Sequence, residues 1–308
     1  MRTTAPPRNH NDFGEPIVKA DFSIGVCSWC LDRHDVCRSI EVAGRDLGLH
    51  SAQVGFFTEQ AVRNSNAAAM LEAARAFDVK LVGAFVAFEG ENYASITHIA
   101  ATGGFMSDDS YSSRLAITCA AIDLAAELRC PSLSLHAGTI PSDATAPIYA
   151  KLLARVGEVA NYAAGRGLRL LLETGREPAD VLLRFIDAAD RRNVGVNFDP
   201  GNFIIYGTDE PVAAATKLKG RIELVHIKDS LRSARPGVDY GRPAPLGAGD
   251  VQIARVISKL RATGYHGPLL IECNTRDISP NALERWGERF SKLDVIRNAV
   301  DYLRTMLA

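Results

Sequence analysis

Short apolar segments alternate with longer amphipathic segments along most of the chain. Eight apolar runs of strand length follow one another from residue 22, each bounded by polar or turn-forming residues. They are residues 22–29, 51–57, 80–88, 132–138, 169–174, 194–199, 222–229 and 268–273. Their near-continuous apolar character is typical of strands that are covered on both faces. The pattern predicts a parallel sheet shielded by helices.

The segments between these runs have helical character. Several open with Pro or Asp, which favour the first turn of a helix. The expected helices are residues 36–47, 60–77, 110–128, 147–166, 178–192, 211–219, 250–263 and 280–307. Eight strands alternating with eight helices in 308 residues favour a closed (β/α)8 TIM barrel over an open doubly wound sheet. The first strand is not followed by GxGxxG, which also counts against a dinucleotide-binding domain.

The chain divides into an arm and one barrel domain. Residues 1–20 are rich in Pro, Asn and charge without periodicity and predict a flexible arm, whereas residues 21–308 predict the single barrel. Residues 89–109 and 231–249 are longer than loops between a strand and a helix need to be. Because both follow the carboxyl ends of strands, where barrel enzymes build their sites, we expect them to cover a substrate. Asp250, after GAG, is expected to cap the next helix.

The composition and charge of the chain restrict the classes of partner that it can be expected to bind. The net charge of −1 and the pI near 6.7 give no overall electrostatic reason to expect nucleic acid or an anionic membrane as a partner. The sequence shows neither a secretory signal pattern nor an apolar run of membrane-spanning length. Cys27 and Cys30 form a CSWC without a second CxxC and are interpreted as core thiols. We therefore expect a reduced, cytoplasmic protein whose partner is a small molecule.

Four strands in the second half end on polar residues that an apolar core does not favour. They are separated by 26, 27 and 46 residues, and the last interval equals one strand–helix unit plus the long connection at 231–249. This spacing places them at equivalent heights on neighbouring strands. Three converging carboxylates repel one another, whereas three carboxylates and an imidazole suit Mn²⁺, Mg²⁺, Co²⁺ or Zn²⁺. We favour this interpretation over separate ion pairs for Glu173, Asp199, His226 and Glu272.

The motifs that carry these residues are similar to those of a known family. ETG at 173–175, VNFDPGN at 196–202, HIKD at 226–229 and IECN at 271–274 resemble the sugar phosphate isomerase/epimerase superfamily of xylose isomerase-like TIM barrels. This superfamily includes ketose 3-epimerases, hydroxypyruvate isomerases and inosose dehydratases, and the resemblance covers residues from about 22 to 305. It implies one divalent metal ion, a homodimer or homotetramer, and a sugar or sugar-like polyol ketone as substrate. It also implies metal binding by all four residues and proton exchange by Glu173 and Glu272.

Further residues are candidates for binding the substrate. Ketose 3-epimerases commonly have a histidine three residues after the metal-binding aspartate, where this chain has Asn202. Asparagine can donate a hydrogen bond to a substrate hydroxyl but cannot titrate near neutral pH. The resemblance therefore leaves open which sugar reaction the chain catalyses. The lysine two residues after His226 points to the same side of its strand and either binds a substrate oxygen or pairs with an acid. The full set of candidates is His136, Asn202, Lys228, Glu91 and Arg242.

Several reactions are compatible with these residues. Proton abstraction next to a carbonyl, through a metal-stabilised enediolate, gives epimerisation or isomerisation. The same carbanion can expel a β-hydroxyl or a glycosidic oxygen, which makes a dehydratase or lyase acting on an inosose or a 3-keto-sugar or glycoside the first alternative. Sugar binding without turnover is a second one. An apurinic-site endonuclease is a remote alternative, because those enzymes use three zinc ions and a basic surface, and this chain has seven histidines and no cationic excess.

Overall fold

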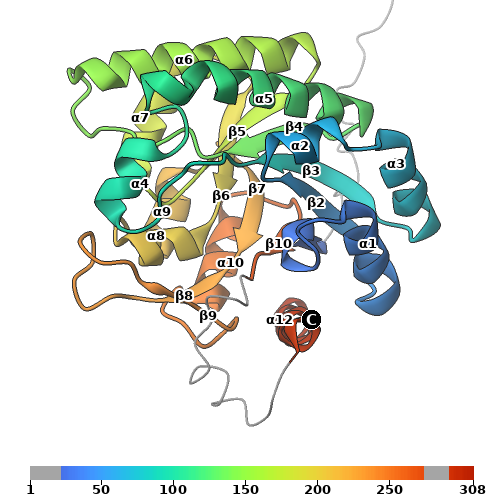
Figure 1. Cartoon of the computed structure of the whole chain (residues 1–308). Coiled ribbons are helices and arrows are strands. Elements are labelled where there is room, and N and C mark those ends of the chain that lie inside the picture. Colours follow the sequence, from blue (N-terminus) through green and yellow to red (C-terminus); the bar gives the residue numbers. More distant parts are fainter. Residues whose placement is uncertain (1–21, 274–290) are drawn as a thin grey trace, which may run out of the picture.

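Eight parallel strands close into a barrel in the computed structural model, which describes residues 22–273 and 291–308 (Figure 1). Around the barrel the order is β1, β10, β7, β6, β5, β4, β3 and β2. Each strand lies within one of the predicted apolar runs, and the predicted (β/α)8 TIM barrel is confirmed. The bounds are β1 Ile24–Cys27, β2 Ser51–Phe56, β3 Lys80–Val86, β4 Ser132–Leu135, β5 Arg169–Glu173, β6 Val194–Phe198, β7 Ile222–Ile227 and β10 Leu269–Ile271.

Helices surround the barrel, and Figure 1 shows the long α5 and α6 side by side across β4 and β5. The α-helices are α1 Val36–Glu41, α2 Glu59–Arg63, α3 Ala67–Ala76, α4 Ile96–Thr102, α5 Asp108–Glu127, α6 Pro147–Gly165, α7 Ala179–Ala189, α8 Pro200–Tyr206, α9 Pro211–Lys217, α10 Ile253–Ala262 and α12 Lys292–Leu307. A 3₁₀ turn η1 at Ser28–Cys30 follows β1, and a π-helical segment η2 at Val42–Asp46 continues α1. Among the described residues, no helix has the length and apolarity that crossing a membrane requires.

Helix α7 illustrates why these segments are helical and why they pack on the barrel. Its buried apolar residues recur at spacings of one, three and four, which places them on one face of the helix, within the hydrophobic core. Each Val, Leu, Ile or Phe side chain of this face, when fully buried, stabilises the fold by roughly 1.5–3 kcal/mol. The helix begins after Pro178 and ends at Asp190, whose φ of 46° is left-handed and stops the helical path. The buried face consists of Val181, Leu182, Phe185, Ile186 and Ala189.

The two long connections contain secondary structure that the sequence pattern does not predict. Residues 89–109 include α4, and an antiparallel pair of strands, β8 Asp229–Leu231 and β9 Arg242–Ala244, encloses most of the connection at 231–249. The short helix α8 follows β6 directly and was also not predicted. All three elements lie beyond the carboxyl ends of barrel strands, on the side where Glu173 ends β5 (Figure 1).

Two predicted helix starts differ from the structure, and two further predictions lie outside the residues that it describes. The expected helix at 60–77 is divided into α2 and α3, because Asn66 caps a new helix by accepting a hydrogen bond from Ala69 N at 3.0 Å. The prediction that Asp250 caps the next helix is wrong: α10 begins after Gln252, and the Asp250 carboxylate accepts a hydrogen bond from Arg232 N at 2.8 Å. The predicted arm, residues 1–20, and the start of the last predicted helix, residues 280–290, lie outside the described residues.

Candidate metal centre and pocket

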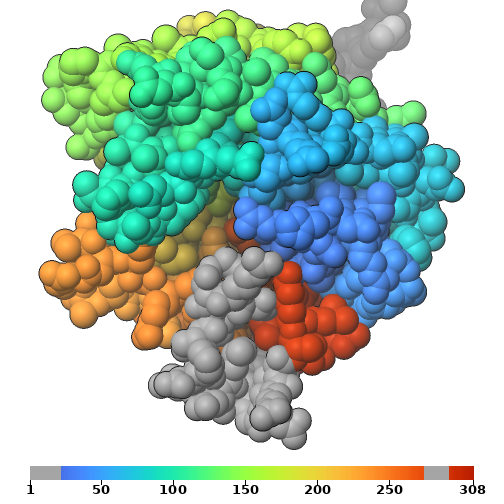
Figure 2. Space-filling view, viewed as in Figure 1, coloured from blue at the N-terminus to red at the C-terminus, as the bar shows by residue number. Residues whose placement is uncertain are grey.

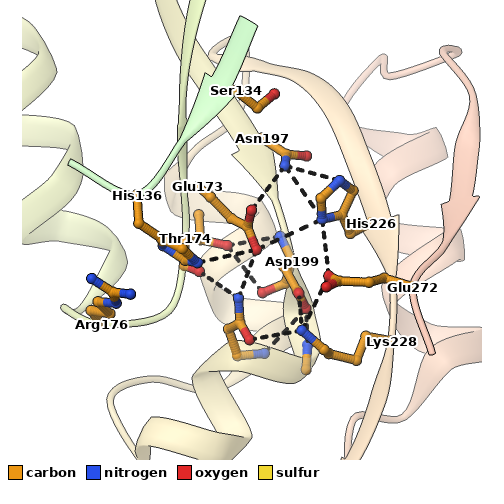
Figure 3. A network of polar contacts seen from close by, with 12 residues as sticks. Ser134, His136, Glu173, Thr174, Arg176, Asn197, Asp199, His226, Lys228 and Glu272 are labelled. Carbon is orange, nitrogen blue, oxygen red and sulfur yellow. Dashed lines mark hydrogen bonds and ion pairs between the residues drawn. The ribbon is translucent and has the colours of Figure 1, made fainter. Parts of the chain in front are cut away.

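Four side chains from neighbouring strands meet at the carboxyl end of the barrel (Figure 3). Glu173 ends β5, Asp199 follows β6, His226 lies in β7, and Glu272 follows β10. Each offers one ligand atom, and these atoms all lie within 4.8 Å of one another. Glu173, Asp199 and His226 are buried, and Glu272 is half-buried. The structure thus brings together the four residues that the sequence spacing placed at one height.

The two carboxylate oxygens of Asp199 have different roles: one caps α8 and the other faces the cluster. It is the N-cap of α8, and its Oδ1 accepts hydrogen bonds from Gly201 N at 2.8 Å and Asn202 N at 3.1 Å. The Thr174 hydroxyl accepts a bond from Asp199 N at 2.8 Å and donates to Asp199 O at 3.0 Å, which ties the chain after β5 to the chain after β6. The capping bonds hold the carboxylate so that Oδ2 is directed at the cluster.

Lys228 bridges the cluster. Its Nζ lies 2.8 Å from Asp199 Oδ2, 3.1 Å from Glu272 Oε2 and 3.0 Å from Asn202 Oδ1. Burial disfavours the charged ammonium, but the carboxylates of Asp199 and Glu272 outweigh it and hold the pKa of Lys228 well above its usual value. The same lysine also lines the pocket, so both an ion pair and a contact with substrate are open to it.

His136 and Asn202 both lie against Glu173. The His136 Nε2 is 3.5 Å from Glu173 Oε1, and burial lowers the pKa of His136 to about 4, so the ring is neutral near pH 7. Asn202 Nδ2 donates to Glu173 Oε1 at 2.9 Å and to Thr174 O at 3.2 Å. Gly175 permits this packing, because it has a φ of +130° and any Cβ there would lie 2.1 Å from the Asn202 Cβ. Asn202 is thus a neutral donor that fixes one glutamate oxygen.

The donor set fits a hard or borderline divalent cation. Burial raises the pKa of Asp199 to about 7, and although Lys228 opposes this increase, the charges of Glu272 and Glu173 add to it, so negative charge from the three acids accumulates at the cluster. Burial also opposes ionisation of Glu272, yet Lys228 and His226 hold its pKa well below the usual value. A divalent ion among three carboxylates and one imidazole would neutralise this excess.

A cavity of about 820 Å³ opens over the cluster. Figure 2 shows the corresponding face hollowed between the blue N-terminal segment, the teal region of α4 and the orange hairpin. Its wall includes the predicted contacts Glu91 and Arg242, together with His136, Asn202 and Lys228. The Glu91 carboxylate is already occupied, since it accepts hydrogen bonds from Gly104 N at 2.7 Å and from the Tyr93 hydroxyl at 2.9 Å. Glu91 therefore braces the loop that forms this wall.

Trp29, in the aromatic wall of the cavity, was not predicted from the sequence. Trp29, in η1, donates its indole N–H to Glu272 Oε1 at 3.2 Å and packs edge-on against His226 with ring centroids 5.8 Å apart. Trp29 thereby restrains the orientation of Glu272, which is a candidate both for binding the metal and for transferring the proton. The signal available in the sequence was its place just after the first strand, where a barrel site is expected. The other aromatic residues that line the cavity are Phe57, Phe85, Phe88, Tyr93, Tyr206 and Tyr240.

The loop after β5 contains a buried acid that does not line the cavity. Burial raises the pKa of Glu177 to about 8, and its Oε2 accepts a hydrogen bond from Ile140 N at 3.3 Å. The pKa of Glu177 is higher in the folded than in the unfolded protein, so at pH 4 the residue is protonated in both states and does not lower the free energy of unfolding. As the pH rises from about 4.5 to 8, the unfolded state ionises first, and the free energy of unfolding falls. We predict that Glu177→Gln raises the free energy of unfolding at pH 8 by roughly 2–4 kcal/mol relative to wild type, and changes it little at pH 4.5.

Urea unfolding at the two pH values measures this effect. Asp180→Asn is the control, because Asp180 is an exposed residue of α7 that should show no such difference. Equal effects of Glu177→Gln at both pH values would contradict the assignment of a protonated buried acid.

Comparison with known proteins agrees with the fold. Residues 42–306 match the family model described as xylose isomerase-like TIM barrel. A xylose isomerase domain protein from Planctomyces limnophilus is 31% identical, with a TM-score of 0.82 and coverage of 93% of this chain and 98% of that chain. Among the curated proteins no significant match is found.

More distant structures share the fold alone. The D-allulose 3-epimerase from Methylomonas sp. is 19% identical with a TM-score of 0.69, and the two chains are covered to 93% and 98%. A xylose isomerase-like TIM barrel protein from Mycobacterium smegmatis, solved in complex with magnesium, is 17% identical with a TM-score of 0.62 and the same coverage, 93% of this chain and 98% of that chain.

Proposed function

Because the chain belongs to the xylose isomerase-like TIM barrel family, we propose that it is a divalent-metal-dependent isomerase or epimerase of a sugar or related polyhydroxy ketone. The observation that carries the proposal is the cluster of Glu173, Asp199, His226 and Glu272, whose ligand atoms lie within 4.8 Å of one another and whose two glutamates line the cavity. The D-allulose 3-epimerase with the same fold is consistent with this class of substrate.

The four residues of the cluster would hold one divalent ion. When bound, such an ion polarises the substrate carbonyl and stabilises the negative charge that develops on its oxygen. Mn²⁺, Mg²⁺, Co²⁺ and Zn²⁺ all accept this combination of carboxylate and imidazole ligands.

The two glutamates supply the proton chemistry. One of Glu173 and Glu272 removes the proton from the carbon next to the carbonyl, and the other returns a proton to the opposite face or to the adjacent carbon. Asn202 and Lys228 hold the carboxylates through hydrogen bonds of 2.9 Å to Glu173 Oε1 and 3.1 Å to Glu272 Oε2. The neutral His136 ring, at the cavity wall, is placed to hydrogen-bond a substrate hydroxyl.

Incubation in D₂O tests this reaction. Metal-loaded protein is mixed with a panel of ketoses, inososes and 3-keto-glycosides, and the products are followed by NMR. An isomerase or epimerase incorporates deuterium at the carbon next to the carbonyl and yields a product of unchanged composition. An unsaturated, dehydrated product would contradict isomerisation and support the alternative dehydratase or lyase.

The endonuclease alternative lacks support at the site. The four-residue cluster contains one histidine, and the chain has no cationic excess to bind a phosphate backbone. A small-molecule partner is therefore the proposal that suits the cavity, and a homodimer or homotetramer remains our expectation for the assembly.

A further inference from the structure

A glutamine holds the side of His226 that faces away from the carboxylates. Gln53 lies on β2, fully buried inside the barrel, and its Oε1 is 2.6 Å from His226 Nε2. A buried amide needs hydrogen-bond partners at both its oxygen and its nitrogen. The other partners of Gln53 therefore determine which end of its amide meets the histidine.

Two neighbours fix the orientation of this amide. Gln53 Nε2 donates to the carbonyl oxygen of Ala84 at 3.2 Å and to Ser134 Oγ at 3.1 Å. The Ala84 oxygen can only accept, so turning the amide over would set two carbonyl oxygens against each other. The oxygen of Gln53 must then face His226, and the thiol of Cys27, 3.9 Å away, also donates to it.

The orientation of Gln53 decides where His226 carries its proton. Because the Gln53 oxygen only accepts, Nε2 of His226 must be the protonated nitrogen. When the ring is neutral, its lone pair is then on Nδ1, the nitrogen that faces the carboxylates, 3.1 Å from Glu272 Oε2 and 3.7 Å from Glu173 Oε1, where a cation would take the place of the Nδ1 proton. Asn197 Nδ2 lies 3.1 Å from Nε2 and 3.4 Å from Nδ1 and also donates to Glu173 Oε2 at 3.4 Å, whereas the Gln53 oxygen makes the shortest contact with the ring, 2.6 Å from Nε2.

We propose that Gln53 is a positioning residue that fixes the tautomer of His226, so that Nδ1 and not Nε2 is the nitrogen that binds the cation. The inference rests on the metal site proposed above and adds a residue to it. Gln53 does not line the cavity, so it acts only through His226. Hydrogen-bond partners of metal-bound histidines typically change metal affinity by about 10–100-fold when they are removed.

The wild-type protein itself tests the tautomer. Long-range ¹H–¹⁵N NMR of ¹⁵N-histidine-labelled, Zn²⁺-loaded protein reports which ring nitrogen is protonated, and a His226→Gln variant identifies the signals. We expect a proton on Nε2 and none on Nδ1. A proton on Nδ1 in the wild-type protein would overturn the inference without any variant of Gln53.

Three variants test the role of Gln53. Gln53→Met has a similar shape but no acceptor, and we expect its Mn²⁺ affinity by calorimetry to fall about 10–100-fold with altered NMR signals of His226. Gln53→Glu keeps an acceptor oxygen for Nε2 but sets its other oxygen against the Ala84 carbonyl, so we expect the proton to stay on Nε2 of His226 while the stability of the fold falls. Ser134→Ala removes one donor contact of the amide but leaves Ala84 to orient it, so its affinity should stay close to that of wild type.

The outcomes separate this inference from the proposed function. Wild-type affinity in a folded Gln53→Met variant, or weakened affinity with unchanged His226 signals, would remove Gln53 from its role while leaving the metal site intact. If Gln53→Met does not fold, the NMR signals of His226 in the wild-type protein and in Gln53→Glu still test which ring nitrogen is protonated. A wild-type protein that binds neither Zn²⁺ nor Mn²⁺ would instead refute the metal site itself.

Discussion

Replacing Glu272 with glutamine is expected to lower turnover by about 10³-fold, because an amide can neither accept the proton that leaves the carbon next to the carbonyl nor return one to it. The change keeps the size of the side chain and one oxygen for the contact with the Trp29 indole, which is 3.2 Å long in the wild-type protein. It removes the negative charge that pairs with Lys228 and His226. Steady-state kinetics on the substrate identified by the D₂O screen measure the effect.

A matched control shows that the effect is local. Glu72→Gln makes the same chemical change at an exposed position of α3 and should leave turnover unchanged. Circular dichroism and thermal unfolding of both variants establish that they are folded. A Glu272→Gln variant that keeps more than roughly a tenth of wild-type turnover would remove Glu272 from the proton transfer.

Removing the divalent ion is the second change with a large expected effect. We predict that dialysis against a chelator lowers turnover by roughly 10³-fold or more. The reason is that the negative charge that develops on the substrate oxygen loses several kcal/mol of stabilisation. Without the ion, Lys228 remains as the cation between Asp199 and Glu272. A lysine bound to two acids cannot replace a divalent charge.

Restoring the metal completes this experiment. Adding Mn²⁺, Mg²⁺, Co²⁺ or Zn²⁺ singly should recover activity to different extents and identify the preferred ion. Protein carried through the same dialysis without chelator controls for general inactivation. Full turnover in protein whose metal content is shown by elemental analysis to be negligible would contradict the role of the ion.

The sequence predicts the barrel and the ligand cluster because both depend on local pattern and spacing. Apolar runs of strand length recur at one strand–helix interval, and in a parallel barrel this interval alone places Glu173, Asp199 and His226 at one end. Helix α8 escaped prediction for a local reason. Its first residues, Pro200 and Gly201, are typical of a turn, and the capping bonds of Asp199 are visible only in the structure.

The supporting residues could not be predicted because their partners are remote in sequence. Trp29 meets Glu272 across 243 residues and Gln53 meets His226 across 173 residues, so no local window contains both members of either pair. For Gln53, the signal in the sequence is a polar residue inside a strand, SAQVGF. The error at Asp250 has the same origin, since the hairpin of β8 and β9 brings Arg232 to it.

Calorimetric titration of metal-free protein with Mn²⁺, compared between wild type and Asp199→Asn, tests whether the cluster of three carboxylates and one imidazole binds a divalent ion. Asparagine retains the capping oxygen that accepts bonds from Gly201 N and Asn202 N, so the variant loses the charge at the cluster but not the start of α8. We expect one Mn²⁺ bound per wild-type chain and a large loss of affinity in the variant. No binding to the wild-type protein, or equal affinity in the two proteins, would contradict this expectation.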